Sequence, residues 1–588
     1  MKSAAVALAL ALLSASPAGA REYRYVTLSD GGSIRCGDAP ANWQKPDGDE
    51  AGFVARQLQP DRGPPGVARP DGGAQAEPPD AGVGCAGTMY LRWHFSVGGE
   101  LSKLATTTLR IRYAHGFAAY LNGVEIARRR LAPGADAAAT ATDYHGPEFE
   151  SVYVPVKPGL LRARGNVLAV EVHPHTAGKH PYAEVELGGA DGARIVRGPY
   201  LTRLGEHEVT VELDTDLPTL AEVRWGATEA YGKIDTDAPA ARHHALRLTG
   251  LPSGAVVHYR VRVRPGSAAV ALTRGLPVGP DPGPPAPASA SDANDDGVVD
   301  AGDAAFHTPP ARDQPLRFAV YGDTRTGHDI HALLDQRLLE EDPDLAILTG
   351  DLVDMGSDDG DWEKFFDIAR TLLRQLAIFP APGNHEYARL GHGISKFLSF
   401  FRWPVRPGED DAAFYSFDLS GVHFVALDSH QYRSARQLAW FGRDLAEARR
   451  SGARAIFVYA HEPCWSTGLH GDNATCIHDY APLMEKNHVA MFFAGHDHDY
   501  ERGRVGALNY LVTGGAGAGL RWAHCGVPGK RACPPHVFAF ANEHHYVMVE
   551  VLPHQFRICP KRIDGTPLEP CVDLPLPGSL SGVSSSSK

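Results

Sequence analysis

The spacing of apolar residues changes its character partway along the chain. In the first half, short apolar runs alternate with polar residues, as in residues 109–113, which is typical of strands with one buried face. Asn122-Gly123 separates two such runs, and this dipeptide strongly favours a β-hairpin. The pattern predicts two successive β-sandwiches, over residues 21–195 and 196–310.

From Leu316 onward, continuous apolar runs alternate with longer amphipathic stretches. The runs suit buried strands of a largely parallel sheet, and the stretches suit helices. The predicted strands are 317–321, 345–349, 378–381, 414–419, 422–427, 455–459, 489–493, 509–512 and 545–551, and the predicted helices are 331–341, 361–376, 435–450 and 480–487. An α/β domain of αββα type, built on two mixed sheets, accounts for residues 311–578.

Both ends of the chain differ from these regions. Residues 1–20 have the pattern of a signal peptide, with Lys2, a short apolar run and Ala18-Gly19-Ala20 as a cleavage site. The Ser-rich residues 579–588 predict a disordered tail. Since no later apolar run is long enough to span a bilayer, we expect a secreted or periplasmic protein without a membrane span.

Composition supports export and excludes one class of partner. The 588 residues carry a net charge of −13 with no basic run, which disfavours binding to a nucleic acid scaffold. Eight cysteines allow 105 pairings, and sequential pairing is preferred here because each bond would then close a single loop. The predicted pairs are Cys36/Cys85, Cys464/Cys476, Cys525/Cys533 and Cys559/Cys571.

An acidic segment, 292–303, has the spacing of a calcium loop. Oxygen-bearing side chains stand at loop positions 1, 3, 5, 9 and 12, with Gly297 at position 6 for a sharp turn, and this resembles the EF-hand loops of dockerin-type repeats. The candidate Ca²⁺ ligands are Asp292, Asn294, Asp296, Val298, Asp300 and Asp303. The alternative is an acidic, solvated linker, because the chain has a single such loop without clear flanking helices.

Residues that ligate metals follow several of the predicted C-terminal strands. Asp351 stands directly after the apolar run 345–348 and Thr349-Gly350, where open α/β folds bind their ligands. The other strand-end motifs are Gly322-Asp323, Gly383-Asn384-His385-Glu386, His461 and Gly495-His496-Asp497-His498. A pair of cations a few ångströms apart needs a shared carboxylate plus oxygen and imidazole ligands from separate loops, and this set supplies them.

These five ordered motifs resemble the calcineurin-like metallophosphoesterases, and most closely their purple-acid-phosphatase-like branch. The resemblance implies two metal ions of the Fe, Zn or Mn class, with Asp351 as the bridging ligand. It assigns Asp323 and His498 to the first metal, and Asn384, His461 and His496 to the second. It also implies a metal-bound hydroxide as nucleophile and His385 as the general acid.

Two positions depart from the family pattern. Arg325 replaces a histidine found in many metallophosphoesterases, and Asp354 replaces the tyrosine ligand of the purple enzymes. The first metal therefore lacks one ligand, and Asp354, His328 or His331 could supply it. Arg325 has two interpretations, a contact to a phosphate oxygen or a surface ion pair.

Other residues of the motifs have supporting roles in this interpretation. Glu386 and Asp497 are expected to orient the ligand imidazoles. Tyr500, Glu501 and Arg502 are expected to be structural.

The N-terminal regions carry weaker resemblances. The runs around 120–128 and 165–173 resemble galactose-binding-like modules, which implies a carbohydrate ligand, with Tyr113, His115 and Tyr120 as candidate contacts. A structural spacer is the alternative. Residues 196–310 resemble the fibronectin type III-like domain that precedes the catalytic domain of purple acid phosphatases.

Together these features predict an exported, binuclear metal-dependent phosphoesterase that acts on a phosphate ester substrate, preferably a phosphomonoester. One alternative within the enzymes is a phosphodiesterase or nucleotidase. The alternative outside them is a polymer- or surface-binding protein whose metal-binding domain is weakly active, which the incomplete first-metal ligand set would explain.

Overall fold

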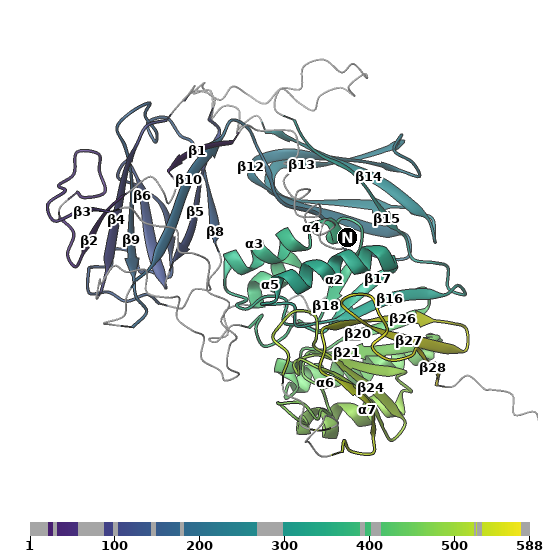
Figure 1. The fold of residues 1–588 in the computed structure, drawn as a ribbon. Coiled ribbons are helices and arrows are strands. Elements are labelled where there is room, and N and C mark those ends of the chain that lie inside the picture. The colour runs from purple at the N-terminus through teal and green to yellow at the C-terminus, as the bar shows by residue number, and fades with distance from the viewer. Residues whose placement is uncertain are drawn as a thin grey trace, which may run out of the picture.

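The computed structural model describes residues 22–26, 32–40, 42–56, 87–97, 101, 104–113, 115–142, 149–176, 181–266, 298–387, 394–401, 413–521, 525 and 532–577. The predicted signal peptide, the predicted tail and Asp292, Asn294 and Asp296 of the predicted calcium loop lie outside these ranges. The chain is multidomain and rich in sheet, with a module of strands at the N-terminal end and a domain of two sheets and several helices at the C-terminal end (Figure 1).

The N-terminal module contains two antiparallel sheets that share one hydrophobic core, and their strand orders are β1-β10-β5-β8 and β3-β2-β4-β9-β6-β7. The strands are β1 (Glu22–Val26), β2 (Gly32–Cys36), β3 (Val54–Arg56), β4 (Met89–Phe95), β5 (Thr106–Tyr113), β6 (Gly116–Leu121), β7 (Val124–Arg129), β8 (Glu150–Pro155), β9 (Asn166–His173) and β10 (Ala183–Ala190). Asn122 and Gly123 join β6 to β7 with positive φ angles of 52° and 83°, which is the conformation that a two-residue hairpin turn requires. The predicted hairpin is therefore present.

Two aromatic residues that are candidates for a sugar site form hydrogen bonds inside this module. Tyr113 is 2% exposed, and its hydroxyl donates to Glu150 at 3.1 Å. The Tyr120 hydroxyl donates to Glu171 at 2.9 Å. Because these hydroxyls have internal partners, the arrangement favours the structural alternative for the module.

A five-stranded antiparallel sheet follows. Its strands are β11 (Ile195–Thr202), β12 (Glu208–Gly226), β13 (Lys233–Thr249), β14 (Val256–Pro265) and β15 (Val299–His307). The long strand β12 pairs with β13 along most of its length, with β11 in its first half and with β14 in its second half. Strand β15 begins at Val299, inside the predicted calcium loop. Asp300 accepts hydrogen bonds from Arg260 and Arg262 across the sheet, at 2.7 and 2.9 Å.

The C-terminal domain is built on two mixed sheets. The first has the order β18-β17-β16-β26-β27-β28, and the second has the order β19-β20-β21-β22-β24-β23-β25. The strands are β16 (Leu316–Tyr321), β17 (Leu345–Leu348), β18 (Ile378–Pro380), β19 (Tyr415–Leu419), β20 (Val422–Ala426), β21 (Ala455–Tyr459), β22 (Met491–Ala494), β23 (Tyr500–Val505), β24 (Leu508–Thr513), β25 (Val537–Ala541), β26 (His545–Val551), β27 (Gln555–Arg562) and β28 (Val572–Pro575). The sheets pack face to face, because Phe318 of β16 contacts Phe424 of β20 and Phe457 of β21, with ring centroids 5.2 and 5.3 Å apart.

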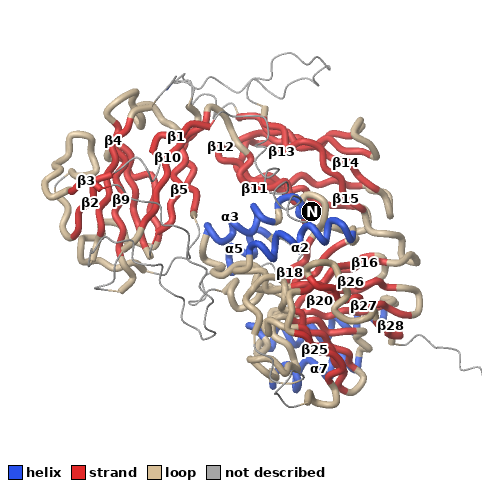
Figure 2. The backbone as a smooth tube through the Cα atoms, viewed as in Figure 1, coloured by secondary structure: helices blue, strands red, loops and turns tan. Residues whose placement is uncertain are grey.

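Helices cover the outer faces of these two sheets. They are α2 (His328–Glu341), α3 (Asp359–Ile368), α4 (Arg370–Leu373), α5 (Ile394–Phe400), α6 (Ala435–Arg450) and α7 (Ala481–Lys486). Helices α2, α3 and α5 lie between the N-terminal sheets and the C-terminal sheets, and α7 lies on the far side (Figure 2). The predicted helix 435–450 is observed with these bounds, capped by the Ser434 side chain. The predicted helix 361–376 is instead two helices, α3 and α4.

The helical layer joins two of the regions into one core. Tyr200 of β11 packs on Phe366 of α3 with ring centroids 5.2 Å apart, and the Arg197 guanidinium lies 4.2 Å from the Phe400 ring centroid. The five-stranded sheet and the C-terminal domain therefore share one hydrophobic cluster, whereas the N-terminal module has its own.

Disulfides join near neighbours in the chain. The bonds Cys464–Cys476, Cys525–Cys533 and Cys559–Cys571 confirm three of the predicted pairs. Cys36 is also in a disulfide, and its predicted partner Cys85 lies outside the described residues.

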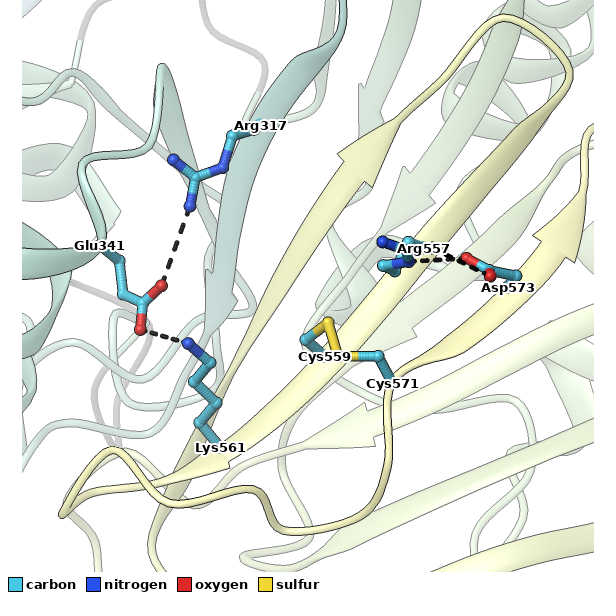
Figure 3. Close-up of a disulfide and its surroundings, with 7 residues drawn as sticks. All are labelled: Arg317, Glu341, Arg557, Cys559, Lys561, Cys571 and Asp573. Carbon is cyan, nitrogen blue, oxygen red and sulfur yellow. Dashed lines mark hydrogen bonds and ion pairs between the residues drawn. A yellow bond between two sulfur atoms is a disulfide. The ribbon is translucent and has the colours of Figure 1, made fainter.

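The Cys559–Cys571 bond joins β27 to the residue that precedes the edge strand β28. Beside it, Arg557 and Asp573 form an ion pair across these strands, and Lys561 pairs with Glu341 at the end of α2 (Figure 3).

Within the described residues, no helix has the length and apolarity needed to cross a membrane.

Candidate metal centre

The predicted ligands come together because parallel strands end at a common edge. In the first sheet β16, β17 and β18 run parallel, and Asp323, Asp351 and Asn384 lie on the loops that follow them. In the second sheet β21 and β22 run parallel, and they lead to His461 and to the loop with His496 and His498. Since the sheets pack face to face, both sets of loops meet at one end of the domain.

Close backbone approach demands special conformations at this edge. Asp323, Asp351 and His496 have φ angles of 63°, 55° and 70°, in the left-handed region that non-glycine residues rarely adopt. At Gly350 an added Cβ would lie 2.8 Å from the backbone nitrogen of Gly383, so only glycine lets these two loops meet. Such strain is characteristic of functional sites.

The side chains form two groups around Asp351. The His461 Nε2 atom lies 3.3 Å from Asp351 Oδ1, 3.0 Å from Asn384 Oδ1 and 3.1 Å from His496 Nδ1. His498 Nε2 lies 3.4 Å from Asp323 Oδ1. Asp323, Asp351 and His461 place one ligand atom each within 4.8 Å of one another. The structure therefore gathers all six residues that the resemblance names as ligands.

The two buried carboxylates have opposite electrostatic surroundings. Burial, opposed first by His461, raises the pKa of Asp323 to about 8. Burial also raises the pKa of Asp351, but the cations around it, His461 first, outweigh burial and hold the pKa below its usual value. The Asp323 Oδ1 atom is buried and accepts no hydrogen bond from the described residues. A buried acceptor that receives no hydrogen bond costs folding free energy unless a cation binds to it. These side chains therefore fit a metal ion.

The imidazoles are also prepared to bind a cation. His461 and His498 each direct Nδ1 to a backbone carbonyl, of Thr349 at 2.9 Å and of Gly519 at 2.7 Å, which points Nε2 of each ring toward the centre. Burial and then His461 lower the pKa of His496 to about 2, and burial and then Arg325 lower the pKa of His498 to about 4. Both of these rings are therefore neutral near pH 7.

His385 lies at the rim of the group. Its Nδ1 atom is 2.6 Å from the Asp354 carbonyl oxygen, and its Nε2 atom is 3.8 Å from Asp351 Oδ2. The side chain is 25% exposed, unlike the buried Asp351. It can therefore reach both the centre and solvent.

The residues offered for the missing first-metal ligand have other contacts. Asp354 accepts a hydrogen bond from Arg325 at 2.7 Å, and Arg325 Nε lies 3.5 Å from Asp351 Oδ2. His331 is buried on α2, 3.5 Å from Asp335 and stacked on Phe365. His328 is half-buried at the first residue of α2. Arg325 and Asp354 thus form a pair at the two positions where the chain departs from the family pattern.

The expected roles of Glu386 and Asp497 were wrong. The Glu386 carboxylate accepts the backbone N–H groups of Asp351 at 2.9 Å and Gly383 at 2.7 Å, so it fixes the two loops and touches no ligand imidazole. Asp497 accepts from the Ser466 hydroxyl at 2.5 Å and from the His470 N–H at 3.0 Å. Both carboxylates therefore organise backbone. By contrast, Tyr500 and Arg502 bond to Glu569, and Glu501 accepts from Tyr510 and Thr467, which fits their expected structural role.

Two residues beside the centre were missed in the sequence. The His470 ring packs on His496, with centroids 3.9 Å apart. The backbone N–H of Arg521 donates to the His498 carbonyl, and the guanidinium charge acts on both His470 and His498. Neither follows a strand directly. Asp497 accepts the backbone N–H of His470, and this contact within a folded loop leaves no pattern in the sequence.

Comparison with known proteins agrees with this geometry. Residues 316–500 match the sequence profile of the family described as Calcineurin-like phosphoesterase. The chain is 32% identical over 206 residues to Purple acid phosphatase 21 of Arabidopsis thaliana, and 31% identical over 212 residues to Purple acid phosphatase 18 of the same plant. Each match covers 34% of this chain and 47% of the relative, so the chain spans about half the length of the curated relatives it matches.

A solved structure shares the fold. The purple acid phosphatase PPD1 from yellow lupin (Lupinus luteus) seeds aligns with a TM-score of 0.55 at 13% sequence identity, over 83% of this chain and 93% of that one. The chain therefore contains a calcineurin-like phosphoesterase domain, and its homologues include purple acid phosphatases. That relationship implies a binuclear metal centre.

Proposed function

We propose that the protein is an exported, binuclear metal-dependent phosphoesterase that hydrolyses phosphomonoesters. The observation that carries the proposal is the convergence of carboxylate, amide and imidazole side chains around Asp351, beside a buried Asp323 Oδ1 atom that accepts no hydrogen bond from the described residues. Asp351 would be shared by the two cations, with Asp323 and His498 on one side. Asn384, His461 and His496 would hold the other cation. Two such ions supply Lewis acidity and lower the pKa of a bound water.

The chain's own residues divide the remaining work. His385 donates a proton from Nε2 to the oxygen of the departing group, and its Nδ1–H bond to the Asp354 carbonyl fixes the ring for that transfer. Arg325 balances the charges of Asp351 and Asp354. Its Nε atom is buried and has no hydrogen-bond partner among the described residues, so it is available to a phosphate oxygen.

A test of this function uses metal-free protein reloaded with Mn, Zn, Fe or Co and assayed on a panel of phosphomonoesters and diesters. We expect monoesters to be hydrolysed with the higher kcat/KM. If the protein retains metal but hydrolyses no ester with any of these ions, the proposal is wrong and the binding-protein alternative takes its place.

One observation favours the nucleotidase alternative. The Tyr387 ring, two residues beyond His385, stacks on His430 with centroids 4.4 Å apart and planes 16° apart. Asp428 holds both residues, since it accepts from the Tyr387 hydroxyl and from the His430 N–H. Tyr387 is half-buried and His430 is exposed, and a fixed aromatic pair that is open on the His430 side is suited to stack on a nucleobase. If His430→Ala has a lower ratio of nucleotide to alkyl phosphate hydrolysis than the wild type, the nucleotidase alternative is supported. An unchanged ratio would exclude that alternative.

We further propose the domain boundaries 21–195, 196–310 and 311–578, with a galactose-binding-like module and a fibronectin type III-like domain before the phosphoesterase domain. The starts of β11 at Ile195 and β16 at Leu316 support these boundaries.

Disulfide bonds persist in oxidising compartments, and their presence supports a secreted or periplasmic location.

A further inference from the structure

The loop after Asp351 supports the proposed general acid. His385 directs Nδ1 to the Asp354 carbonyl, and the Gly356 N–H donates to the His385 carbonyl at 2.8 Å. We call residues 354–358 the acid loop. The Trp362 indole donates to the Gly356 carbonyl at 2.9 Å, which ties this loop to α3. The position of the His385 ring therefore depends on where the acid loop lies.

A residue of the N-terminal module reaches the far end of this loop. Arg130 Nη2 donates to the Ser357 carbonyl at 3.2 Å and lies 3.7 Å from Asp358 Oδ2. Asp358 is fully buried, and its other oxygen accepts the Gly360 N–H at 2.8 Å as the N-cap of α3. A buried carboxylate requires a cation partner, because removal of that partner leaves an uncompensated charge. Arg130 supplies the partner from a different domain.

The module holds Arg130 rigidly. Arg130 Nη1 donates to the Tyr113 hydroxyl at 2.6 Å, and that hydroxyl donates to Glu150 at 3.1 Å. The next strand residue, Ser151, donates its N–H to Glu363 of α3 at 3.0 Å. At Gly360 an added Cβ would lie 2.9 Å from the Phe149 carbonyl oxygen, so the module and α3 meet backbone to backbone. Strand β8 lies beside the end of α3 in Figure 1.

We propose that the N-terminal module is part of the catalytic apparatus, and that Arg130 is a positioning residue which acts through the acid loop on His385. Among the described residues Arg130 contacts Tyr113, Ser357 and Asp358, and none of these is a candidate metal ligand. Its contacts with Ser357 and Asp358 fix the loop whose carbonyl orients the His385 ring. The catalytic part of this inference rests on the proposed phosphoesterase function, whereas the effect on the acid loop does not.

The test compares Arg130→Ala and Arg130→Lys with the control Arg128→Ala in the full-length, metal-loaded protein. Arg128 is a matched control because it stands near the end of β7, two residues before Arg130, and bonds to Glu125, at 2.7 Å, and to the Tyr120 hydroxyl, both inside the module. We expect Arg130→Ala to lower kcat about tenfold while KM changes less than about twofold, since misplacement of a catalytic group affects turnover more than binding. Arg130→Lys should recover part of the loss, and Arg128→Ala should match the wild type.

Hydrogen–deuterium exchange gives a readout that is independent of activity. The acid loop should exchange faster in Arg130→Ala than in the wild type, and at the wild-type rate in Arg128→Ala. Should Arg130→Ala fail to fold, Asp358→Asn takes its place, because it removes the charge but keeps the oxygen that caps α3. Unchanged kcat together with unchanged loop exchange would overturn the proposal. Wild-type protein that hydrolyses no ester would refute the phosphoesterase function alone, and the exchange comparison would still decide whether Arg130 holds the loop.

Discussion

At the scale of single residues, the proposed metal ligands and the proposed general acid differ in how deeply they are buried. Asp351 is 2% exposed and central to the ligand group, whereas His385 is 25% exposed and held from outside by a backbone carbonyl. Asp351 lies 3.3 Å from His461, and His385 lies 3.8 Å from Asp351. The two side chains should therefore fail in different ways when they are changed.

We predict that Asp351→Asn loses bound metal and activity together, because a neutral amide cannot bridge two cations. His385→Ala should retain both metals and lower kcat by about 10²–10⁴-fold, the usual contribution of a general acid. Metal content by elemental analysis and steady-state kinetics on one monoester check both variants. A metal-free His385→Ala protein would show that His385 is a ligand.

Most candidate ligands could be found in the sequence, because parallel strands bring their carboxyl ends to one edge regardless of loop detail. Asp323, Asp351 and His461 each follow an apolar run, so strand prediction also located them. The contacts of Glu386 could not be found in this way, because backbone N–H groups of a folded loop leave no sequence pattern. His470 and Arg521 were missed for a related reason: loop packing, rather than a strand, places them.

At the scale of elements, one buried histidine joins three of them. His423 of β20 lies 2.9 Å from Asp418 of β19 and 2.9 Å from Asp444 of α6. Ser416 of β19 donates to the second oxygen of Asp444 at 2.8 Å. Helix α6 was predicted from its amphipathic pattern, but this contact was not. It depends on an antiparallel register and a helix docking angle, which periodicity does not specify.

The His423 cluster predicts a pH dependence of stability. Burial lowers the pKa of His423, but the two carboxylates outweigh burial and raise it to about 9. Below a pH of about 6.5 the folded and unfolded forms are both protonated, so the full stabilisation is present, and it is lost as the pH rises through about 9. We expect the wild type to lose on the order of 1–3 kcal/mol between these limits through this group.

Denaturant unfolding of the wild type and His423→Gln at pH 6 and pH 9.5 measures this contribution. The variant should be less stable at pH 6, and the difference between the two proteins should shrink at pH 9.5. A constant difference at both pH values would show that His423 stays in one protonation state throughout.

At the scale of the whole molecule, the calcium prediction has to be placed in a shared core. The five-stranded sheet packs its apolar side chains into the same cluster as the phosphoesterase domain, so an isolated fragment would expose part of the core that its described residues share. Asp300 already bonds to Arg260 and Arg262, and Asp303 accepts from Tyr231 at 3.1 Å. A cation in the loop would compete with these contacts.

We predict that millimolar Ca²⁺ stabilises the full-length protein by about 1–3 kcal/mol, because a ligand that binds only the folded state adds RT ln(1 + [L]/Kd). Asp292→Ala combined with Asp296→Ala should abolish the shift. Differential scanning calorimetry across a calcium titration measures it, and activity should change little. Identical melting curves at every calcium concentration would leave the segment as an acidic linker.

The pairing of β14 with β15 has a consequence for the continuity of the chain. These strands flank residues 267–297, and they are joined by antiparallel hydrogen bonds from Val256 opposite His307 to Val263 opposite Val299. A single protease site introduced between them would divide the polypeptide in two without removing any of those bonds. The two pieces should elute together in gel filtration and keep the specific activity of the uncut protein. They should dissociate only in denaturant. The protein would then behave as a heterodimer made from a single gene product.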